Sequence, residues 1–545
     1  MHHAGSKKRG GDDSHMRLAS YLFQRLFDLG ARHAFGLPGD LVLPLYDALG
    51  RSPIRAILTT HEPSAGFAAD AYARLKGIGV AVGTYGAGAL NMVNPIAQAY
   101  AEKSPVVVVS GAPDIAGRDP DLLIHHKVKT FDTQLRMYAQ TTVACAALED
   151  PGTAYREINR VIEAVLHEKR PGYLEIPRDL VWAEIPETAA WRPFAPRRDA
   201  GALAEAMQEI TARINRSRRP VVLAGIEIMR LGLRDRLVTL AERYHLPVAT
   251  SFMGKAVFPE HHANFIGTYM GAAGHPYSRR MVEESDCLLM LGAWLTDTET
   301  GLFTSAIPRG TLVQVLANEV TISHHRYEQV GLVEVLDALL ESPEINPREF
   351  RNESATERVE PRPRSLIAAV FSELSRLDDR RYVFTTDAGD CLFGSVQLNA
   401  ELILNPGYYA SMGFGVPAAL GAGLALPDRR PVALVGDGGF QMTGMEIGTL
   451  VRYGMGAIVI VLNNGGYRSL EALGASRQFC DIHPWDYVGI AASLGATGMR
   501  ARTPEEFSAT LQAACAQTGV ALIEVIVDPN DMSPTLQRLS RRTED

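Results

Sequence analysis

Two apolar runs in the last third of the chain end in oxygen-bearing side chains. The run Val432–Val435 stops before Asp437, which is flanked by glycines, and the run Ala457–Leu462 stops at Asn463 and Asn464. Asp and Asn are disfavoured inside strands, so their place directly after such runs calls for another reason. A carboxylate and an amide oxygen suit a hard cation such as Mg²⁺, which is often completed by phosphates.

The residues between these two ends predict one βαβ unit. Both runs are apolar enough for strands that are buried on both faces. Between them, Thr443 and Glu446 have the T-x-x-E spacing of a capping box, which predicts that a helix starts there. Because parallel strands share their direction, we expect Asp437 and Asn464 at the same carboxyl edge of the sheet, where α/β folds bind ligands.

Glycines surround the aspartate. Gly436, Gly438 and Gly439 lack a Cβ, so their backbone N–H groups can approach a phosphate closely. A short GDG alone is more typical of a turn. It also differs from the G-x-G-x-x-G dinucleotide fingerprint, because Gln441 stands where the last glycine belongs. The full order of strand, GDG, helix, strand and NN therefore carries the prediction of a Mg²⁺–diphosphate site.

Similar strand-like runs alternate with helix-length segments along the whole chain. They are VAVGT, PVVVVSG and YLEIP in the first third, PVVLAG, LPVAT, CLLMLG and LVQVL in the middle, and YVFTTD, VALVGD, AIVIVLNN and LIEVIV in the last. This alternation predicts an α/β protein whose parallel sheets are flanked by helices.

Two Pro- and charge-rich stretches, which start at Pro186 and Ser342, are interpreted as linkers. We expect three α/β domains at residues 16–186, 200–341 and 366–530. The polar, Gly-rich residues 1–15 are interpreted as a lead or tag.

Composition narrows the class of protein. The chain has 545 residues, 46% of them hydrophobic and 21% charged, which is typical of a soluble globular protein with several domains. Its formal charge of −8 gives no support to nucleic acid or an anionic membrane as a partner. No apolar stretch approaches the length of about 20 residues that a membrane helix needs. Five scattered cysteines without CxxC spacing indicate a reducing cytoplasm and argue against disulfides or a zinc site.

The order of strand, GDG, helix, strand and NN resembles the thiamine-diphosphate signature of the pyruvate-decarboxylase-like superfamily. The resemblance extends over nearly the whole chain from Met16. It implies thiamine diphosphate and Mg²⁺ as cofactors, with the ion bound by Asp437, Asn464 and the Gly466 carbonyl. The remaining cofactor-binding residues that it implies are Asp390, Gly438 and Gly439 at the diphosphate, Met412 as the bulky residue that bends the cofactor, and Ala410, whose carbonyl accepts from the pyrimidine amine.

A second stretch resembles the motif that activates this cofactor. In "TTHEPSAGFAADAYARLKG", Glu62 takes the place of the family's activating glutamate. Its carboxylate would promote the imino tautomer of the aminopyrimidine ring, which removes the proton from the thiazolium C2 atom. The following segment, through "GTYGAG" to "PVVVVSGAP", also resembles the family and places Thr84 in the substrate pocket.

Asp40 in "FGLPGD" and the pair His125 and His126 in "LLIHHKVKTFDTQ" resemble the acid–base set of pyruvate, indolepyruvate and phenylpyruvate decarboxylases. Two histidines and an aspartate would supply proton donors near neutral pH, beside the substrate. The chain has two other His pairs, at residues 261–262 and 324–325, in contexts that do not match the family. Those two pairs are predicted to be surface residues.

One position departs from the pyruvate-decarboxylase pattern. The family's catalytic glutamate falls on Leu470, and Glu471 comes one residue later, a rotation of about 100° on a helix. Bacterial phenylpyruvate decarboxylases, which have an apolar residue there, resemble the chain better. This favours a 2-oxo acid with a larger aromatic or branched side chain, with Leu470, His125 and His126 in its pocket. Arg468 is interpreted as a solvated side chain, with recognition of an acidic substrate as the alternative.

The sequence thus predicts a cytoplasmic, Mg²⁺- and thiamine-diphosphate-dependent decarboxylase of a 2-oxo acid such as phenylpyruvate or indolepyruvate. The resemblance implies that the two halves of the site come from different subunits, in a homodimer at least and commonly a tetramer. One alternative is a carboligase of the acetolactate-synthase or benzaldehyde-lyase kind, which would lack the His pair. An alternative of another class is a catalytically silent regulator that binds thiamine diphosphate.

Overall fold

The computed structural model describes residues 16–119, 121–186, 197–352 and 365–541. The predicted lead (residues 1–15) and large parts of the predicted linkers (residues 187–196 and 353–364) lie outside the described residues. The described chain forms two compact units. The first holds residues 16–69, 76–100 and 104–186, and the second holds residues 70–75, 101–103 and the rest of the described chain. Among these residues, no helix is long and apolar enough to cross a membrane.

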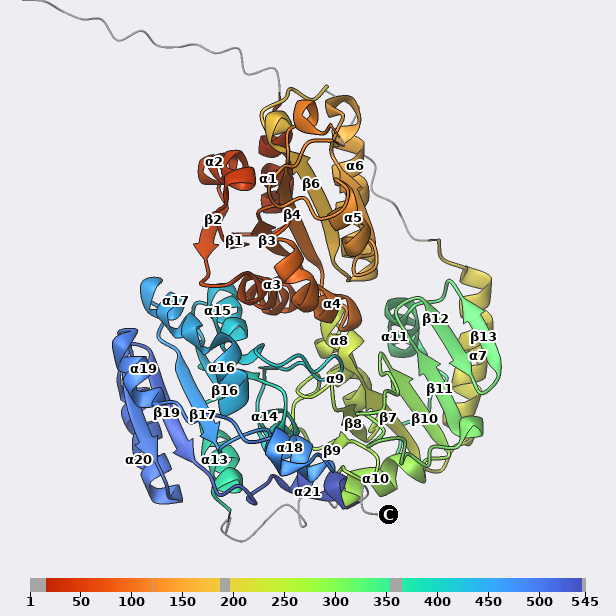
Figure 1. Ribbon diagram of the computed structural model, residues 1–545. Coiled ribbons are helices and arrows are strands. Elements are labelled where there is room, and N and C mark those ends of the chain that lie inside the picture. The colour runs from red at the N-terminus through yellow and green to blue at the C-terminus, as the bar shows by residue number, and fades with distance from the viewer. Residues whose placement is uncertain (1–15, 120, 187–196, 353–364, 542–545) are drawn as a thin grey trace, which may run out of the picture. The chain divides into compact units, whose positions relative to one another are not determined.

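The first unit is built on a six-stranded sheet of order β2-β1-β3-β4-β6-β5, in which every neighbouring pair is parallel (Figure 1). Its strands are β1 (His33–Gly36), β2 (Arg55–Leu58), β3 (Gly79–Gly83), β4 (Val106–Ala112), β5 (Ala144–Ala147) and β6 (Gly172–Pro177). Its helices are α1 (Leu18–Asp28), α2 (Leu43–Arg51), α3 (Glu62–Lys76), α4 (Val93–Ala101), α5 (Thr133–Tyr138) and α6 (Pro151–Glu168). The valines of β4 have no exposed surface, and burying each stabilises the fold by about 1.5–3 kcal/mol.

The second unit contains a seven-stranded central sheet of order β13-β12-β11-β10-β7-β8-β9. Its strands are β7 (Pro220–Ala224), β8 (Val248–Ser251), β9 (Phe265–Tyr269), β10 (Cys287–Leu291), β11 (Leu312–Val315), β12 (Glu319–Ile322) and β13 (His325–Glu328). Its helices are α7 (Ala200–Arg216), α8 (Ile226–Arg230), α9 (Arg234–Tyr244), α10 (Pro276–Glu283) and α11 (Leu332–Glu341). The sheet is parallel except at one edge, where β12 and β13 run antiparallel. Only two residues connect these strands, and so short a connection can join only antiparallel neighbours.

The second unit also contains a six-stranded parallel sheet of order β15-β14-β16-β17-β19-β18. Its strands are β14 (Tyr382–Thr386), β15 (Ile403–Leu404), β16 (Arg430–Gly436), β17 (Ile458–Asn463), β18 (Thr497–Ala501) and β19 (Ala521–Ile526). Its helices are α13 (Leu366–Leu374), α14 (Asp390–Gly394), α15 (Gly415–Ala425), α16 (Asp437–Thr443), α17 (Ile447–Arg452), α18 (Arg468–Ala472), α19 (Tyr487–Ser493), α20 (Pro504–Ala516) and α21 (Pro534–Ser540). The α/β class with parallel sheets is therefore confirmed.

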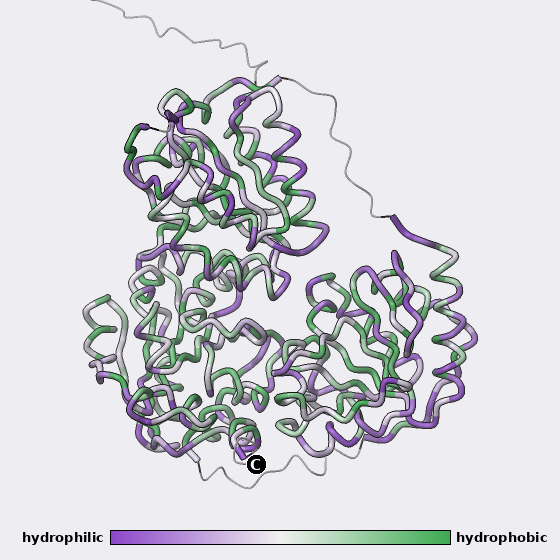
Figure 2. The backbone as a smooth tube through the Cα atoms, turned by 45° about the vertical axis from the view of Figure 1, so that its right-hand side comes forward, coloured by the Kyte–Doolittle hydropathy of each residue, from purple (hydrophilic) through white to green (hydrophobic). Residues whose placement is uncertain are grey.

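Local signals explain where the longer helices begin. The Asp150 side chain accepts a bond from the backbone N–H of Gly152 (2.9 Å) at the start of α6, and Pro151 follows at the first helical position. Thr503 and Pro504 do the same for α20. Such helices bury one face on a sheet, so hydrophobic stretches follow the interior of each domain and hydrophilic stretches gather on the outer helices and loops (Figure 2).

The helix of the βαβ unit begins earlier than the sequence predicts. Helix α16 starts at Asp437, directly after β16, and the 3-10 turn η7 (Gly444–Glu446) separates it from α17. Thr443 makes no capping bond, because its hydroxyl donates to the carbonyl of Gly413 (2.7 Å). The capping-box prediction is wrong, whereas the two strands of the unit are confirmed as the parallel pair β16 and β17.

Candidate active site

A pocket of about 260 Å³ lies at the carboxyl edge of the last sheet. It is lined by Asp437 from the end of β16, Asn464 from the end of β17 and the residues that follow β14. Strand β16 pairs in parallel with both β14 and β17, so all three strand ends reach the same edge. The predicted cofactor residues that the pocket brings together are Asp390, Ala410, Met412, Asp437, Gly438, Gly439, Asn464 and Gly466.

Asp437 is a buried carboxylate at the start of α16, with 2% of its surface exposed. One oxygen accepts from the N–H of Gly438 (2.8 Å), and the other accepts from Gly465 (2.7 Å) and Gly466 (2.9 Å). Burial raises the pKa of Asp437 to about 6, although these three bonds lower it. The group is therefore an anion at neutral pH, and a buried anion of this kind is stabilised by a bound cation.

The two asparagines after β17 have different surroundings. The Asn463 side chain donates to Glu524 (2.7 Å), a buried residue of the neighbouring strand β19. The side-chain oxygen of Asn464 is buried and has no hydrogen-bond partner among the described residues, and Asn464 lines the pocket. A buried oxygen without a donor needs a partner, and beside a carboxylate it fits an oxygen-preferring cation.

The glycines at this edge are required by close packing. A Cβ on Gly438 would lie 2.2 Å from the Tyr467 ring, and one on Gly439 would lie 2.9 Å from the Asp387 carboxylate. A Cβ on Gly466 would lie 2.1 Å from the Cys480 carbonyl oxygen. Glycine at these positions lets the backbone lie this close to its neighbours, and the N–H groups of Gly438 and Gly466 donate to Asp437. The oxygen donors and the glycine backbone together fit Mg²⁺ and a diphosphate.

Asp387 is a site residue that the sequence reasoning missed. Its buried carboxylate accepts from the N–H groups of Gly413 (2.9 Å), Gly415 (2.8 Å) and Ala388 (2.9 Å). These bonds fix the start of α15 and the segment before it, which carries Ala410 and Met412 into the pocket lining. The signal was present in the sequence, because Asp387 directly follows the strand YVFTT at the same sheet edge.

Asp390 lines the pocket, but its carboxylate is occupied. Both oxygens accept from Ser533, one from its N–H (2.8 Å) and one from its hydroxyl, and Ser533 caps α21. Burial raises the pKa of Asp390 to about 6. The bonds to Ser533 tie α14 to α21 beneath the pocket. A direct contact between Asp390 and a diphosphate stays a prediction.

Arg468 is buried rather than solvated, with 6% of its surface exposed, so that interpretation is wrong. Its guanidinium donates to the carbonyls of Asn464 (3.2 Å) and Gly465 (3.0 Å) and to the carboxylates of Glu471 (2.8 Å) and Asp481 (2.6 Å). With these acceptors Arg468 holds the loop that carries the predicted Mg²⁺ ligands. Glu471 is turned to Arg468, whereas Leu470 lines the pocket and is 50% exposed.

We expect Arg468→Met to weaken Mg²⁺ binding by about 10- to 100-fold, because the loop loses the donors that orient it. The dissociation constant is measured with Mn²⁺ as a paramagnetic substitute, in an EPR titration. Arg477→Met is the matched control, because Arg477 lies 3.8 Å from the same two carboxylates but is exposed and donates to no carbonyl of this loop in the described part of the chain. Equal losses in both variants would show that charge, rather than loop geometry, controls the affinity.

In the first unit, Asp40, His125 and His126 form one cluster. Asp40 begins the turn η1 (Asp40–Val42) after β1, and the two histidines lie in the loop after β4. The Asp40 carboxylate is hydrogen-bonded to His125 and lies 3.7 Å from the ring nitrogen of His126, and the two rings meet edge to face at 4.7 Å. The bond and the charge of His125 hold the pKa of Asp40 below its usual value, although burial opposes this. These groups can therefore share protons.

Thr84 and Glu62 lie at the same sheet edge. Thr84 follows β3 and packs against Gly39, where a Cβ would lie 2.6 Å from the Thr84 side chain. Its hydroxyl oxygen is buried without a partner among the described residues. Glu62 is the first residue of α3, after β2, and accepts from the Asn91 side chain (3.0 Å). The first unit thus places its predicted catalytic residues after β1, β2 and β4, and the predicted pocket residue Thr84 after β3, which lies between β1 and β4 in the sheet.

In each of the other His pairs one ring contacts a glutamate, His262 with Glu242 and His325 with Glu209 (3.1 Å). His261, His324 and His325 are exposed, and His262 is half-buried beside Glu242 (3.2 Å). The prediction of surface positions is confirmed for the three exposed histidines and is wrong for His262. A histidine pair by itself is therefore not informative in this chain.

Comparisons with known proteins show which family the chain resembles. Three models of thiamine pyrophosphate (thiamine diphosphate) enzymes match the chain: the N-terminal TPP binding domain at residues 16–137, the central domain at 207–342 and the C-terminal TPP binding domain at 387–525. The chain is 40% identical over 533 residues to an indole-3-pyruvate decarboxylase of Azospirillum brasilense, covering 96% of this chain and 97% of that protein.

Two further relatives are more distant. An alpha-keto-acid decarboxylase of Mycobacterium avium is 31% identical over 550 residues and covers 96% of each chain. A pyruvate decarboxylase of Neurospora crassa is 30% identical over 549 residues, covering 95% of this chain and 94% of that protein. All three relatives are matched over nearly their full length.

Proposed function

Because this chain belongs to the thiamine-diphosphate-dependent 2-oxo acid decarboxylases, we propose that it converts an aromatic 2-oxo acid, such as phenylpyruvate or indolepyruvate, to an aldehyde and CO₂. The cluster of Asp40, His125 and His126 carries the proposal. One side-chain nitrogen or oxygen atom of each residue lies within 4.8 Å of such an atom of the other two. Such a cluster can deliver a proton to substrate carbon, the step that separates decarboxylation from carboligation.

The pocket residues would hold the cofactors. Asp437, Asn464 and the Gly466 carbonyl would bind Mg²⁺, with Arg468 keeping their loop in place. The backbone at Gly438 and Gly439 would face the diphosphate, Met412 would support the bend of the cofactor, and the Ala410 carbonyl would accept from its amine. When bound, thiamine diphosphate stores the electrons that are released as the substrate's carboxylate leaves.

The first-unit residues would manage protons. The Glu62 carboxylate would exchange a proton with the aminopyrimidine ring. His125 Nε2 and His126 would hold the proton that the substrate carbon accepts after CO₂ leaves, and Asp40 would orient both rings. The apolar Leu470 in the pocket and the relationship to an indole-3-pyruvate decarboxylase both support a large, uncharged substrate side chain.

We further propose the organisation of the protein. The domains would span residues 16–186, 200–341 and 366–530. Glu62 and the Mg²⁺ pocket would be contributed to each site by different subunits of a homodimer or a tetramer. The enzyme would be cytoplasmic, as the cysteine usage indicates.

The test is CO₂ release and product identification with the purified protein, Mg²⁺ and thiamine diphosphate. The substrates are pyruvate, branched-chain oxo acids, phenylpyruvate, indolepyruvate and an oxo acid with a charged side chain. We expect aldehydes, with kcat/KM for the aromatic acids at least about tenfold above that for pyruvate. Acyloin as the main product would support a carboligase, and cofactor binding without CO₂ from any substrate would support a silent regulator.

A further inference from the structure

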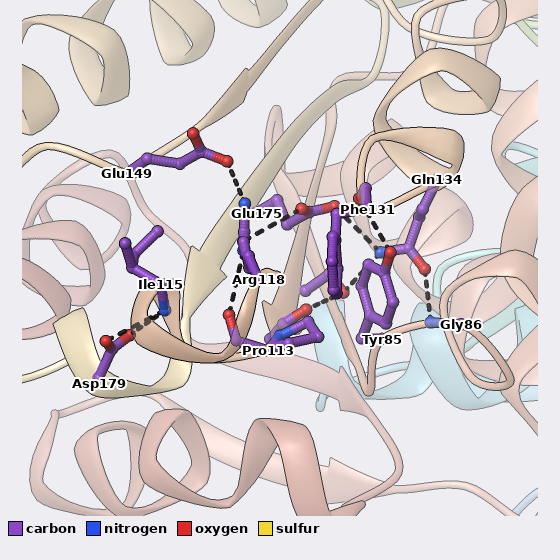
Figure 3. A network of polar contacts seen from close by, with 12 residues as sticks. Tyr85, Gly86, Pro113, Ile115, Arg118, Phe131, Gln134, Glu149, Glu175 and Asp179 are labelled. Atoms are coloured by element: carbon purple, nitrogen blue, oxygen red, sulfur yellow. Dashed lines mark hydrogen bonds and ion pairs between the residues drawn. The ribbon is translucent and has the colours of Figure 1, made fainter. Parts of the chain in front are cut away.

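The loop between β4 and α5 carries His125 and His126, and a polar network fixes it to the sheet (Figure 3). At its start, the N–H of Ile115 donates to both oxygens of Asp179 (3.1 Å each). At its end, the Tyr85 hydroxyl donates to the carbonyl of Phe131 (2.8 Å). The loop is therefore held on both sides of the histidines.

Gln134, at the start of α5, connects this loop to the sheet interior. The residue is 1% exposed. Its side-chain nitrogen donates to the hydroxyls of Ser110 (3.0 Å) and Tyr173 (2.5 Å) and lies 3.4 Å from the Glu175 carboxylate. Its side-chain oxygen accepts from the N–H of Gly86 (2.7 Å). Every polar atom of the amide is used.

Gly86 packs directly against His126. A Cβ at Gly86 would lie 2.4 Å from the His126 carbonyl oxygen and 2.7 Å from its Cβ. Both residues have left-handed backbones, with φ of +67° at Gly86 and +67° at His126. A non-glycine residue in this conformation is strained and persists only where its surroundings hold it. Gln134 fixes Gly86, and Gly86 defines where His126 can lie.

Glu175 anchors the other end of the network. It is 1% exposed, accepts from the Tyr173 hydroxyl (2.7 Å) and lies 3.8 Å from Arg118, whose side chain also donates to the carbonyl of Pro113 (3.2 Å). Burial raises the pKa of Glu175 to about 7, although Tyr173, Arg118 and Gln134 lower it. A buried acid with these partners restrains both Gln134 and the start of the loop.

We propose that Gln134, held by Tyr173 and Glu175, is a positioning residue that sets the place of His126 and His125 through Gly86. The proposal rests on the proposed function for the acid–base role of the histidines, but not for the restraint itself. Gln134 touches no substrate, so its effect on the reaction passes through the loop. A displaced histidine slows proton delivery without weakening the binding of the cofactor.

The test compares Gln134→Leu with wild type by hydrogen exchange and by kinetics. We expect amides in residues 121–133 to exchange faster by about tenfold or more, because a buried bonded amide is lost. We expect kcat to fall by about 10- to 100-fold, as for a catalytic group that is slightly misplaced, with KM and the affinity for thiamine diphosphate unchanged. Tyr85→Phe, a milder change, should also make the loop amides exchange faster and lower kcat, each by about two- to tenfold.

Thr142→Val is the matched control, because Thr142 is also buried in the first unit and donates one bond, to the Tyr138 carbonyl (2.7 Å). It should leave loop exchange and kcat unchanged. Unchanged loop exchange in both Gln134→Leu and Tyr85→Phe would overturn the proposal, as would an equal loss of kcat in Thr142→Val. Hydrogen exchange needs no substrate, so a wild-type protein without decarboxylase activity would contradict the proposed function alone.

Discussion

Glu62→Gln is expected to lower kcat by about 10²- to 10⁴-fold, the usual contribution of a positioned acid–base group. Glutamine has the same shape and can keep the bond from Asn91, but it cannot exchange a proton with the aminopyrimidine ring. The affinity for thiamine diphosphate, measured by quenching of protein fluorescence, should change by less than about tenfold, because Glu62 acts on proton transfer rather than on the diphosphate. Steady-state CO₂ release gives kcat.

Glu157→Gln provides the comparison for this variant. Glu157 is a half-buried residue of α6 and pairs with Arg160 (2.8 Å), so the same chemical change there should leave kcat unaltered. If Glu62→Gln retained kcat within about threefold of wild type, a role for this carboxylate in acid–base catalysis would be refuted.

Asp437→Asn is expected to weaken Mg²⁺ binding by at least about 100-fold and to abolish activity at ordinary Mg²⁺ concentrations. Losing a direct ligand should cost at least as much as losing a residue that only orients one. The amide also removes the buried negative charge that the cation would neutralise, and it turns an N–H₂ group toward a neighbouring backbone donor. Isothermal titration with Mg²⁺ in the presence of thiamine diphosphate measures the loss, and excess Mg²⁺ should recover activity only in part.

Asn463→Ala and Asn464→Ala separate the two asparagines in the same assay. Asn463 is bonded to Glu524, so its replacement should leave Mg²⁺ affinity unchanged, apart from a small loss of stability. Asn464 offers a buried oxygen without a partner among the described residues. Its replacement should weaken Mg²⁺ binding, as Asp437→Asn does, but to a smaller degree. Equal effects at the two positions would contradict the assignment of the metal ligands.

The sequence predicted the parts of the fold that are long, apolar and buried on both faces. Strands such as β4 and β17 are recognisable because almost every residue is apolar. The missed strands are mostly short or partly exposed: β13 is exposed over most of its length, and β18 is buried only at Ala501. Their place in a sheet is decided by pairing with a neighbour, which a local pattern does not record.

The candidate site was likewise predicted only in part from local sequence patterns. Asp437 and Asn464 follow strong strand signals, so a rule about parallel strands was enough to bring them together. Arg468, Asp387 and Gln134 were misjudged or missed because their roles depend on buried acceptors and donors from distant parts of the chain. The guanidinium of Arg468, for example, reaches Asp481, 13 positions further on. Burial of a polar side chain cannot be read from its own residue type.

The most direct test of the central claim is exchange of the C2 proton of protein-bound thiamine diphosphate with deuterium, followed by acid quench and NMR. It measures cofactor activation without any assumption about the substrate. We expect the wild-type protein with Mg²⁺ to exchange this proton at least about 10³-fold faster than the Glu62→Gln variant, within the range of acid–base contributions. Equal exchange rates in the two proteins would contradict the claim that Glu62 activates a thiamine cofactor.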